Sequence, residues 1–403
     1  MMTLLYLLLL PMLSGIGMLG LGPALMAGRA GAAHVVLLLS GLLLPLRGLM
    51  YLLLARRRGN RPGRMSVLLA AVELLLGAGL LLLPQLSVRL FAVVVAVYLT
   101  LLVTVEAVNA ILYGRMRRWG AFFPAMAAAV GGTGLFVLIV FVPALRDAAL
   151  RYTAALLLTV FGTGLVCDVL ALTIRSRRVR RVLGSIRVAL PDLMSLFLPQ
   201  RTADVLPRAP LGPVPQQGTE EFELLFQTSA HGIGLVGHCE LCFDGRTLTY
   251  GAYDPVHQRL LRTAGAPREP YLRWCIGTHH RRVISYSLRL PPAQAAQLRA
   301  ELERFRQTLS PWQPEALPED CFAGRLRRLG GVRFWRVQRG PYATYFIPTI
   351  NCVSLTNELL EKTDIGRTVM LGLKTPGAYL DLLEREYLAG NPAVTARRVY
   401  DKI

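Results

Sequence analysis

Two side chains in the second half of the chain, Cys352 and His238, have the types found in thiol-dependent catalytic pairs. Cys352 opens a helical pattern, "CVSLTNELL", directly after Asn351. A helix N-terminus lowers the pKa of a cysteine through its partial positive charge and free N–H groups, and the thiolate is the nucleophile. A catalytic cysteine also needs a base, usually a histidine. We therefore expect Cys352 to attack and His238, in "VGHCELCFDG", to take its proton.

The surroundings of the thiol suggest further roles and leave alternatives open. Free N–H groups at the helix start can hold an oxyanion. Asn351 is of the type that caps a helix N-terminus, or alternatively helps to bind substrate. A lone cysteine before a helix is more often a small buried apolar residue, and a lone strand histidine is more often structural. The competing bases are His231, His257, His279 and His280.

The elements that must position this pair alternate between strand and helix patterns, which predicts an α+β domain. Asp244-Gly245 predicts a hairpin turn and Pro291-Pro292 a helix start. Strands are expected in "FELLFQTS", "GLVGHCELCFDG", "RTLTYGAYD", "RRVISYSLRL", "VRFWRV" and "ATYFIPT", and helices in "AQAAQLRAELERFRQTL", 352–360 and "KTPGAYLDLLEREYL".

A Gly-His strand that precedes an Asn-Cys helix by more than 100 residues gives the second half its resemblance. With "DGRTLTYGAYD", "PPAQAAQLRAEL" and "TINCVSLTNELL", residues 220–365 resemble the circularly permuted papain-fold group. That group includes NlpC-type hydrolases and lecithin retinol acyltransferase-like proteins. The resemblance implies that Cys352 is the nucleophile and His238 the base. Where acyltransferase-like members often carry a second histidine, this chain has Tyr250, so the orienting group is either Tyr250 or Glu240, which shares a strand face with His238.

The first half is a membrane protein by composition. More than half of the 403 residues are hydrophobic, yet Lys and Arg exceed Asp and Glu by 20. Apolar segments of roughly 20 residues are long enough to cross a bilayer. They lie at 3–27, 33–54, 65–84, 90–113, 120–144 and 152–174. The N-terminus lacks a charged region and a cleavage site, which favours a retained first span over a signal peptide.

Arginines cluster after the second, fourth and sixth spans, so the positive-inside rule predicts that both termini are cytoplasmic. "GIGMLGLGP", "GAGLLLLP" and "GTGLFVLIVFVP" each open with Gly-x-Gly and end in proline, which indicates three repeated two-helix hairpins. With "LLLGAGLLLLPQLSVRLFAVVVAVYL", this pattern makes residues 10–175 resemble the HdeD family. That resemblance implies a six-helix bundle linked with acid stress.

Four ionisable residues lie inside the predicted spans at nearly one depth: Arg47, Glu73, Glu106 and Asp168. Charge at that depth is costly unless it is paired or hydrated. We expect a polar cluster in which Arg47 bridges two or more carboxylates. The alternative is that Arg47 extends to the interface and the acids are neutral packing residues.

A hinge at 176–220 separates the membrane domain, 1–175, from the α+β domain, 221–403. Its polybasic start favours anionic inner-leaflet lipids, and "PRAPLGPVPQQG" is typical of a semi-rigid linker. Nucleic acid is not expected, because the basic residues follow the membrane ends. No cofactor or metal is expected either, since Cys239 and Cys242 lie in a strand pattern that points them to opposite faces.

Together these observations predict a six-helix transmembrane bundle followed by a permuted papain-like α+β domain. The predicted function is a membrane-anchored cysteine hydrolase or acyltransferase, acting on an amide or ester at the inner membrane face. One alternative is an extracytoplasmic cell-wall amidase with inverted topology. The other is a non-enzymatic ligand-binding domain coupled to an HdeD-like bundle.

Overall fold

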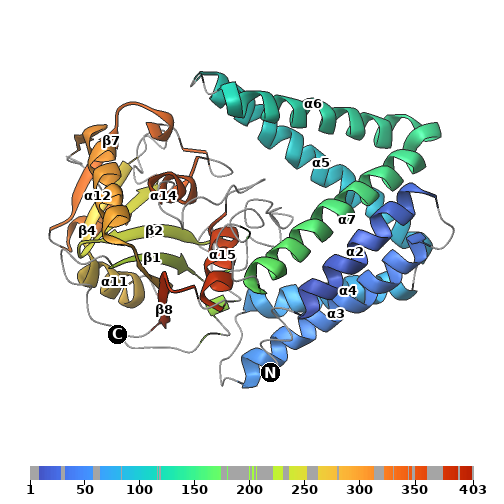
Figure 1. Cartoon of the computed structure of the whole chain (residues 1–403), viewed down its shortest axis with the longest axis horizontal. Coiled ribbons are helices and arrows are strands. Elements are labelled where there is room, and N and C mark those ends of the chain that lie inside the picture. Colours follow the sequence, from blue (N-terminus) through green and yellow to red (C-terminus); the bar gives the residue numbers. More distant parts are fainter. Residues whose placement is uncertain are drawn as a thin grey trace. The chain divides into compact units, whose positions relative to one another are not determined.

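A computed structural model gives the structure of the chain, which divides into two compact units (Figure 1). The first comprises Met1–Leu54 and Val67–Val188, and the second Ala55–Ser66 and Ala189–Ile403. The structure describes residues 9–28, 32–57, 64–82, 84–115, 117, 119–173, 179, 199, 202–203, 206, 221–229, 236–251, 262–278, 281–312, 322–329, 331–343, 345–346, 350–360, 375–388 and 391–401. The predicted linker and most of the polybasic hinge lie outside these residues.

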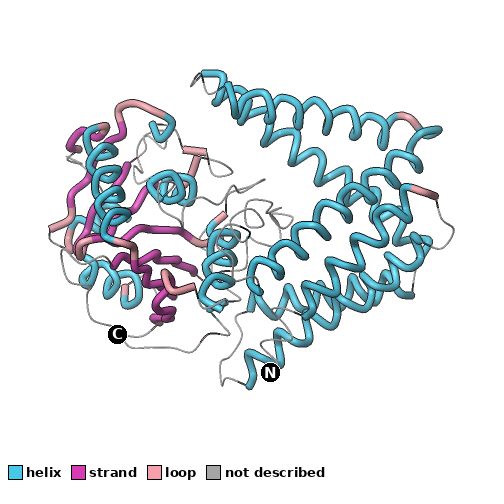
Figure 2. Tube along the Cα trace, viewed as in Figure 1, coloured by secondary structure: helices cyan, strands magenta, loops and turns pink. Residues whose placement is uncertain are grey.

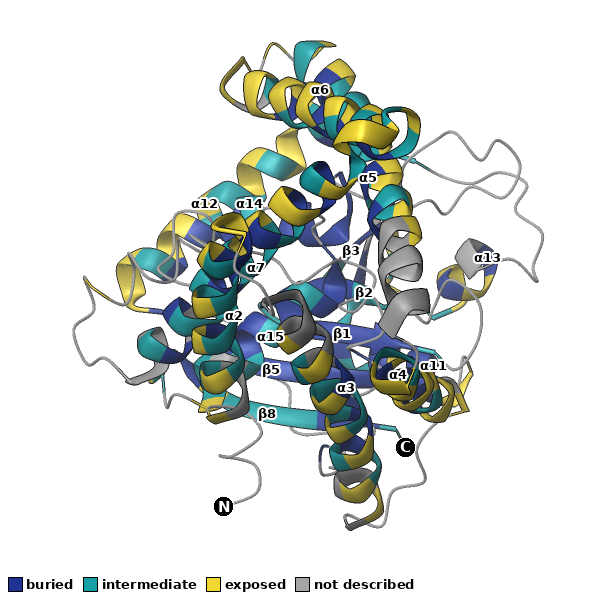
Figure 3. Cartoon of the chain, turned by 90° about the vertical axis from the view of Figure 1, so that its right-hand side faces the viewer, coloured by how far each residue is buried: buried dark blue, intermediate teal, exposed yellow. Residues whose placement is uncertain are grey.

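The first unit is helical, and Figure 3 shows exposed residues along its helices. Many of these exposed residues are large and apolar. Its helices are α2 (Leu10–Met26), α3 (Ala32–Arg57), α4 (Arg64–Leu82), α5 (Pro84–Arg115), α6 (Trp119–Phe141) and α7 (Pro143–Thr173). Three described segments are long and apolar enough to cross a membrane, Val95–Arg115, Phe122–Phe141 and Pro143–Cys167. Exposed leucines such as Leu75 and Leu82, at 73% and 77%, are typical of a surface that meets lipid.

The first glycine of each Gly-x-Gly motif lies at a helix crossing. A Cβ at Gly15 would come within 2.9 Å of a side chain on α7. A Cβ at Gly77 would come within 2.3 Å of a side chain on α3, and one at Gly132 within 2.8 Å of a side chain on α5. Small residues let helix backbones approach closely. A Cβ at the second glycine of each motif, Gly17, Gly79 or Gly134, would meet nothing within 4 Å.

These contacts join α4 to α3, α6 to α5, and α2 to α7. Figure 1 shows α2 beside α7, and these two helices share extensive contacts. The predicted hairpins instead pair each odd-numbered span with the span that follows it, and of these α6 and α7 are also in contact. The glycine motifs therefore mark helix packing, but the partner helix could not be read from the repeat.

Two of the four predicted intramembrane ionisable residues form a pair. Arg47 Nη2 donates to Glu73 Oε1 at 2.9 Å, which joins α3 to α4. Glu106 accepts a hydrogen bond at 3.3 Å from the side chain of Asn109, one turn further along α5. The side chain of Asp168 lies outside the described residues.

The second unit is built on one antiparallel sheet with the strand order β6-β7-β4-β3-β2-β1-β5-β8 (Figures 1 and 2). Its strands are β1 (Glu221–Thr228), β2 (His238–Phe243), β3 (Arg246–Gly251), β4 (Arg262–Pro267), β5 (Arg282–Arg289), β6 (Leu309–Pro311), β7 (Arg333–Val337) and β8 (Val394–Tyr400). Its helices are α11 (Arg268–Gly277), α12 (Pro292–Gln307), α13 (Phe322–Arg327), α14 (Cys352–Leu360) and α15 (Pro376–Leu388).

Helices cover both faces of this sheet. On one face α11 packs on alternate strand residues, which include Leu225 and Cys242. On the other face the ring of Phe226 meets Tyr379 of α15, and α14 packs on β2 and β3. Because side chains alternate along a strand, neighbouring residues of β1 and β2 belong to two different cores.

A buried ion pair fixes the start of α11 to the sheet. The guanidinium of Arg268 donates two hydrogen bonds to the carboxylate of Glu223 on β1, and both side chains are almost fully buried. Ser285 on β5 also donates to Glu223 at 3.1 Å. The arginine lies at the first residue of α11, so this pair sets where the helix enters the core.

Most of the predicted strands and helices are confirmed, and the turn at Asp244-Gly245 has the positive φ angles, 48° and 71°, of a tight hairpin. The strand predicted in "ATYFIPT" is not found among the described residues of that segment. Residues Pro341–Ala343 form a short 3-10 helix, η3, and Phe346 pairs with Ile350 in an isolated bridge. Strands β4, β6 and β8 and helices α11 and α13 were not predicted.

Candidate active site

Asn351 explains why α14 begins at Cys352. Its Oδ1 accepts the N–H groups of Val353 and Ser354 at 2.9 and 3.0 Å, and its own N–H donates to Ser354 Oγ at 2.8 Å. These bonds satisfy groups that a helix start leaves unpaired. The structure therefore places Asn351 as the N-cap, with its side-chain oxygen already used by the helix.

The Cys352 thiol lies where the first turn of α14 meets β2. Its Sγ accepts the N–H of Cys239 at 3.4 Å, and the residue is only 4% exposed. Thr356, one turn further on, donates to the Cys352 carbonyl and lies 4.0 Å from Cys239 Sγ. The sulfur is thus held against the peptide bond that follows His238.

Burial decides the charge of this thiol. Burial and, as a smaller effect, the negative charge of Glu240 raise the pKa of Cys352 from 9.0 to about 11. The backbone N–H groups of Cys239, Val353 and Cys352 oppose this shift. The helix terminus acts in the predicted direction, but removal from water is the larger effect. The expectation of a lowered pKa is therefore wrong, and the resting group is a neutral thiol.

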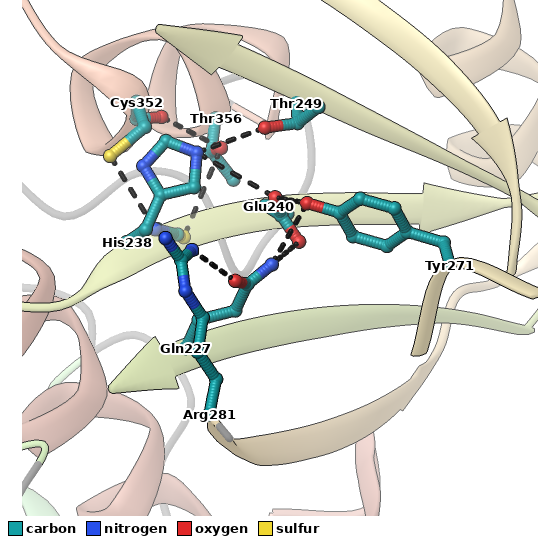
Figure 4. Close-up of polar contacts among 9 residues, drawn as sticks. Gln227, His238, Glu240, Thr249, Tyr271, Arg281, Cys352 and Thr356 are labelled. Atoms are coloured by element: carbon teal, nitrogen blue, oxygen red, sulfur yellow. Dashed lines mark hydrogen bonds and ion pairs between the residues drawn. The ribbon is translucent and has the colours of Figure 1, made fainter. Parts of the chain in front are cut away.

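His238 is the first residue of β2, opposite Gln227 of β1. Its Nε2 lies 2.9 Å from Thr249 Oγ1 on β3 and 3.6 Å from Glu240 Oε1. In Figure 4 the second ring nitrogen lies on the side of the Cys352 sulfur. The structure therefore places Glu240 beside the predicted base, and it holds the sulfur of the predicted nucleophile at the backbone N–H of the residue that follows this base.

The imidazole is neutral in this environment. The pKa of His238 is lowered, mainly because the ring is removed from water and secondarily because of the positive charge of Arg281. A neutral imidazole has one nitrogen that donates and one that can accept a proton. Thiol and imidazole are thus both uncharged at rest.

Three further side chains hold Glu240 in place (Figure 4). Gln227 Nε2 donates to Glu240 Oε2 at 2.7 Å and to the Tyr271 hydroxyl at 2.9 Å, and that hydroxyl donates to Glu240 Oε1. Arg281 Nη1 donates to Gln227 Oε1 at 2.7 Å. Burial raises the pKa of Glu240, and hydrogen bonds from Tyr271, Thr249 and Gln227 oppose that shift.

Sequence reasoning missed Thr249, Gln227, Tyr271 and Arg281. It left Tyr250 and Glu240 as alternatives for the orienting group, and the Tyr250 hydroxyl instead donates to the Tyr342 carbonyl at 2.9 Å. Tyr250 lies on the sheet face of α14, close enough for a Cys352 thiolate to raise its pKa, although burial raises it more. The contact with His238 is made by the preceding residue, Thr249. The competing bases His231, His257, His279 and His280 lie outside the described residues.

The two cysteines of the C-x-x-C segment point away from each other, as expected. Cys239 faces α14, whereas Cys242 lies in the core under α11. Among the residues that the structure describes, no three His, Cys, Asp or Glu side chains gather closely enough to hold a metal ion.

Comparison of the chain with protein-family models, with curated proteins and with solved structures found no match. The resemblances to the HdeD family and to the permuted papain-fold group therefore stay predictions, and the argument for function depends on the site itself.

Proposed function

We propose that this protein is a membrane-anchored thiol-dependent hydrolase or acyltransferase. Cys352 is the nucleophile and His238 the base. The observation that carries the proposal is the Cys352 sulfur at the N-terminus of α14, bonded to the N–H of the residue that follows His238. This contact joins residues that are 113 positions apart in the sequence. It supports the same pair, Cys352 and His238, as the order of the two motifs in the sequence.

The uncharged pair suits acyl transfer by a general-base route. As Cys352 Sγ bonds to the acyl carbon of an amide or ester, its proton passes to His238, which then protonates the leaving nitrogen or oxygen. Because Asn351 already accepts from Val353 and Ser354, the N–H groups of Cys352 and Cys239 are the donors nearest the sulfur for the oxyanion. Water or an acceptor hydroxyl or amine then releases the acyl group from sulfur.

The membrane half bears on the substrate. Three apolar helices support membrane association, and we propose six crossings with both termini in the cytoplasm. The polybasic segment after the last span would then hold the catalytic domain near anionic lipids of the inner leaflet. This location favours an amide or ester of a lipid, or an acylated protein, over cell-wall polymer.

The burial of Cys352 favours one alternative function, a ligand-binding domain without catalysis. A thiol that is 4% exposed with a pKa of about 11 resembles a packed apolar residue more than an activated nucleophile. In that case Cys352 contributes packing only, and a serine in its place leaves the protein's cellular effect unchanged.

The test uses the detergent-solubilised full chain and a panel of chromogenic acyl esters and thioesters, with mass spectrometry of the Cys352 peptide. We expect burst release of the chromophore and an acyl adduct on Cys352, both absent in C352S. The matched control is C275S, because Cys275 is equally buried but lies in α11 on the opposite sheet face. Equal turnover by wild type and C352S would refute the proposal.

Cellular profiling addresses the substrate. Lipid and peptide profiles of cells that express wild type or C352A are expected to differ in an acylated species. Reporter fusions at the C-terminus test the proposed orientation. A reporter that is active only outside the cytoplasm would favour the inverted topology of a cell-wall amidase.

A further inference from the structure

We propose that the β7 end of the sheet is a docking surface for anionic phospholipids. Its residues are Arg246, Arg333, Trp335, Arg336 and Arg339, which together are called the arginine edge below. The inference rests on the membrane association proposed above and is independent of the chemistry of Cys352. It extends that association, because it assigns lipid contact to a folded surface of the second unit in addition to the polybasic segment.

The segment around β7 carries charge of one sign only. Residues 322–346 contain six arginines and no Asp or Glu. Arg333, Arg336 and Arg339 are all exposed. Soluble surfaces usually intersperse both signs of charge, whereas a surface of a single sign attracts a partner of the opposite sign. The charge of this segment therefore fits an anionic partner.

Contacts across three strands add Arg246 to this segment. Arg246 Nη2 donates to the carbonyls of Gly265 and Gly331, at 3.3 and 3.0 Å. Gly265 of β4 is opposite Arg333 of β7, and Gly331 comes two residues before Arg333. Partial removal from water lowers the pKa of Arg246, and the positive charges of Arg333 and Arg306 lower it further. Like charges thus gather at the start of β7, and a bound anion would relieve their repulsion.

Trp335 gives the arginine edge a partly exposed aromatic ring. A Cβ at Gly265 would come within 2.9 Å of its six-membered ring, so the indole lies against the residue whose carbonyl binds Arg246. Tryptophan is enriched where a membrane meets water, because its ring is apolar and its N–H is polar. Guanidinium groups bind phosphate through two parallel hydrogen bonds. Arginines around a tryptophan therefore suit the headgroup level of an anionic bilayer.

The opposite end of the sheet provides a comparison within the same unit, since β7 and the β5–β8 pair lie toward different ends of the strand order (Figure 1). Arg289 of β5 pairs with Glu221, and Arg397 of β8 pairs with Glu384. Among the described residues, no carboxylate pairs with an arginine of the arginine edge. The β5–β8 end thus neutralises part of its own charge, whereas the arginine edge leaves its charge to an external anion.

A bilayer fits this surface better than a soluble polyanion does. The same chain contains three helices that are long and apolar enough to cross a membrane. A chain inserted through them keeps its second unit tethered to a lipid surface. Tethering raises the effective concentration of phospholipid phosphates at the unit, so that even weak contacts are occupied.

The experiment uses the full chain in lipid nanodiscs of phosphatidylcholine, alone or mixed with phosphatidylglycerol. Both leaflets have the same composition, so the orientation of the chain does not matter. Phenylglyoxal modifies exposed guanidinium groups, and mass spectrometry gives the rate at each arginine. In the mixed discs we expect Arg333 and Arg336 to react about 3- to 10-fold more slowly, and Arg289 and Arg398 at an unchanged rate. About 1 M NaCl, which shortens the Debye length to about 3 Å, should remove the protection.

Charge-removing variants test whether the arginine edge acts as one surface. R333Q/R336Q removes two positive charges from it, and the matched control R289Q/R398Q removes two from the opposite end of the sheet. Thermal unfolding of both variants checks that the fold is retained. In mixed discs the reporter Arg339 should lose at least about half of its protection in R333Q/R336Q and keep it in the control.

Three outcomes would overturn the inference. Equal protection of Arg333, Arg336, Arg289 and Arg398 would mean that the unit lies near the lipid without a preferred surface. Unchanged rates in the mixed discs would mean that the arginine edge does not meet lipid. Protection in phosphatidylcholine discs by duplex DNA or inorganic phosphate, as strong as that by phosphatidylglycerol, would assign the surface to a soluble anion. Because these readouts do not use acyl turnover, the docking surface and the proposed chemistry can fail separately.

Discussion

Alkylation of Cys352 should depend steeply on pH, because burial keeps the group a thiol. Its pKa is raised from 9.0 to about 11, a difference of two units. Near neutral pH this leaves about a hundredfold less thiolate than an exposed cysteine has. The rate with iodoacetamide should therefore rise about tenfold per pH unit between about pH 7 and 10, and level off near pH 11.

Quantitative mass spectrometry of the Cys352 peptide, after timed exposure of the folded chain to iodoacetamide, measures this rate. Cys242 is an internal reference, because its pKa is raised to about 12 and it should react more slowly at each pH. The perturbation is E240Q. Since the negative charge of Glu240 raises the Cys352 pKa, E240Q should move the profile of Cys352 toward lower pH.

A rate that is high and flat between pH 7 and 9 would refute this reasoning. It would mean that the helix N-terminus and the backbone N–H groups outweigh burial, so that Cys352 is a thiolate at rest. A profile that E240Q leaves in place would separately refute the electrostatic influence of Glu240 on the sulfur.

Three further predictions concern stability. R268M should destabilise the second unit by about 3–5 kcal/mol, because it leaves the charge of Glu223 buried and unpaired. The double variant E223L/R268M should recover most of this stability in tryptophan-monitored unfolding. Losses that simply add in the double variant would contradict this prediction. The pKa of His238 is lowered from 6.5 in the fold, so the unfolded chain binds the proton first as the pH falls. Below about pH 6.5 the free energy of unfolding should therefore decrease by up to about 1.4 kcal/mol per pH unit. Unfolding measured over this pH range should show a smaller decrease in H238Q than in wild type. Equal acid sensitivity of wild type and H238Q would exclude this origin. G77A should lower the thermal stability of the helical unit by about 1–3 kcal/mol, since its Cβ would lie 2.3 Å from Pro45, whereas G79A should leave it unchanged; equal effects of the two substitutions would argue against the crossing.

Local patterns predicted the elements that carry the candidate pair. The alternation of β1 and β2, the Asp244-Gly245 turn and the apolar spacing of α14 are all properties of a few neighbouring residues. Strand β4, "RTAGAP", lacks the alternation of a strand in its own sequence. It becomes a strand by pairing with β3 and β7. The pattern "ATYFIPT" has the alternation of a strand, but no neighbouring strand pairs with it along its described length.

The site could be predicted only in part for the same reason. Counting outward from the Asp244-Gly245 turn places Thr249 opposite Glu240, so the sequence held a signal for Thr249 that the prediction overlooked. Gln227 of β1 and Tyr271 of α11 hydrogen-bond to Glu240, and Arg281 hydrogen-bonds to Gln227. Only the folded chain brings these residues together. The burial that raises the Cys352 pKa is likewise a property of tertiary packing.

The two-residue turn at Asp244-Gly245 has a consequence for how this chain can diverge. A relative with one residue inserted or deleted there would slide β2 by one position against β3 and exchange the sides on which His238 and Cys239 emerge. The imidazole would then lie under α14 and a thiol beside Thr249. The length of this hairpin is thus a criterion for separating homologues that keep the arrangement of His238 and Cys239 from those that retain only the architecture.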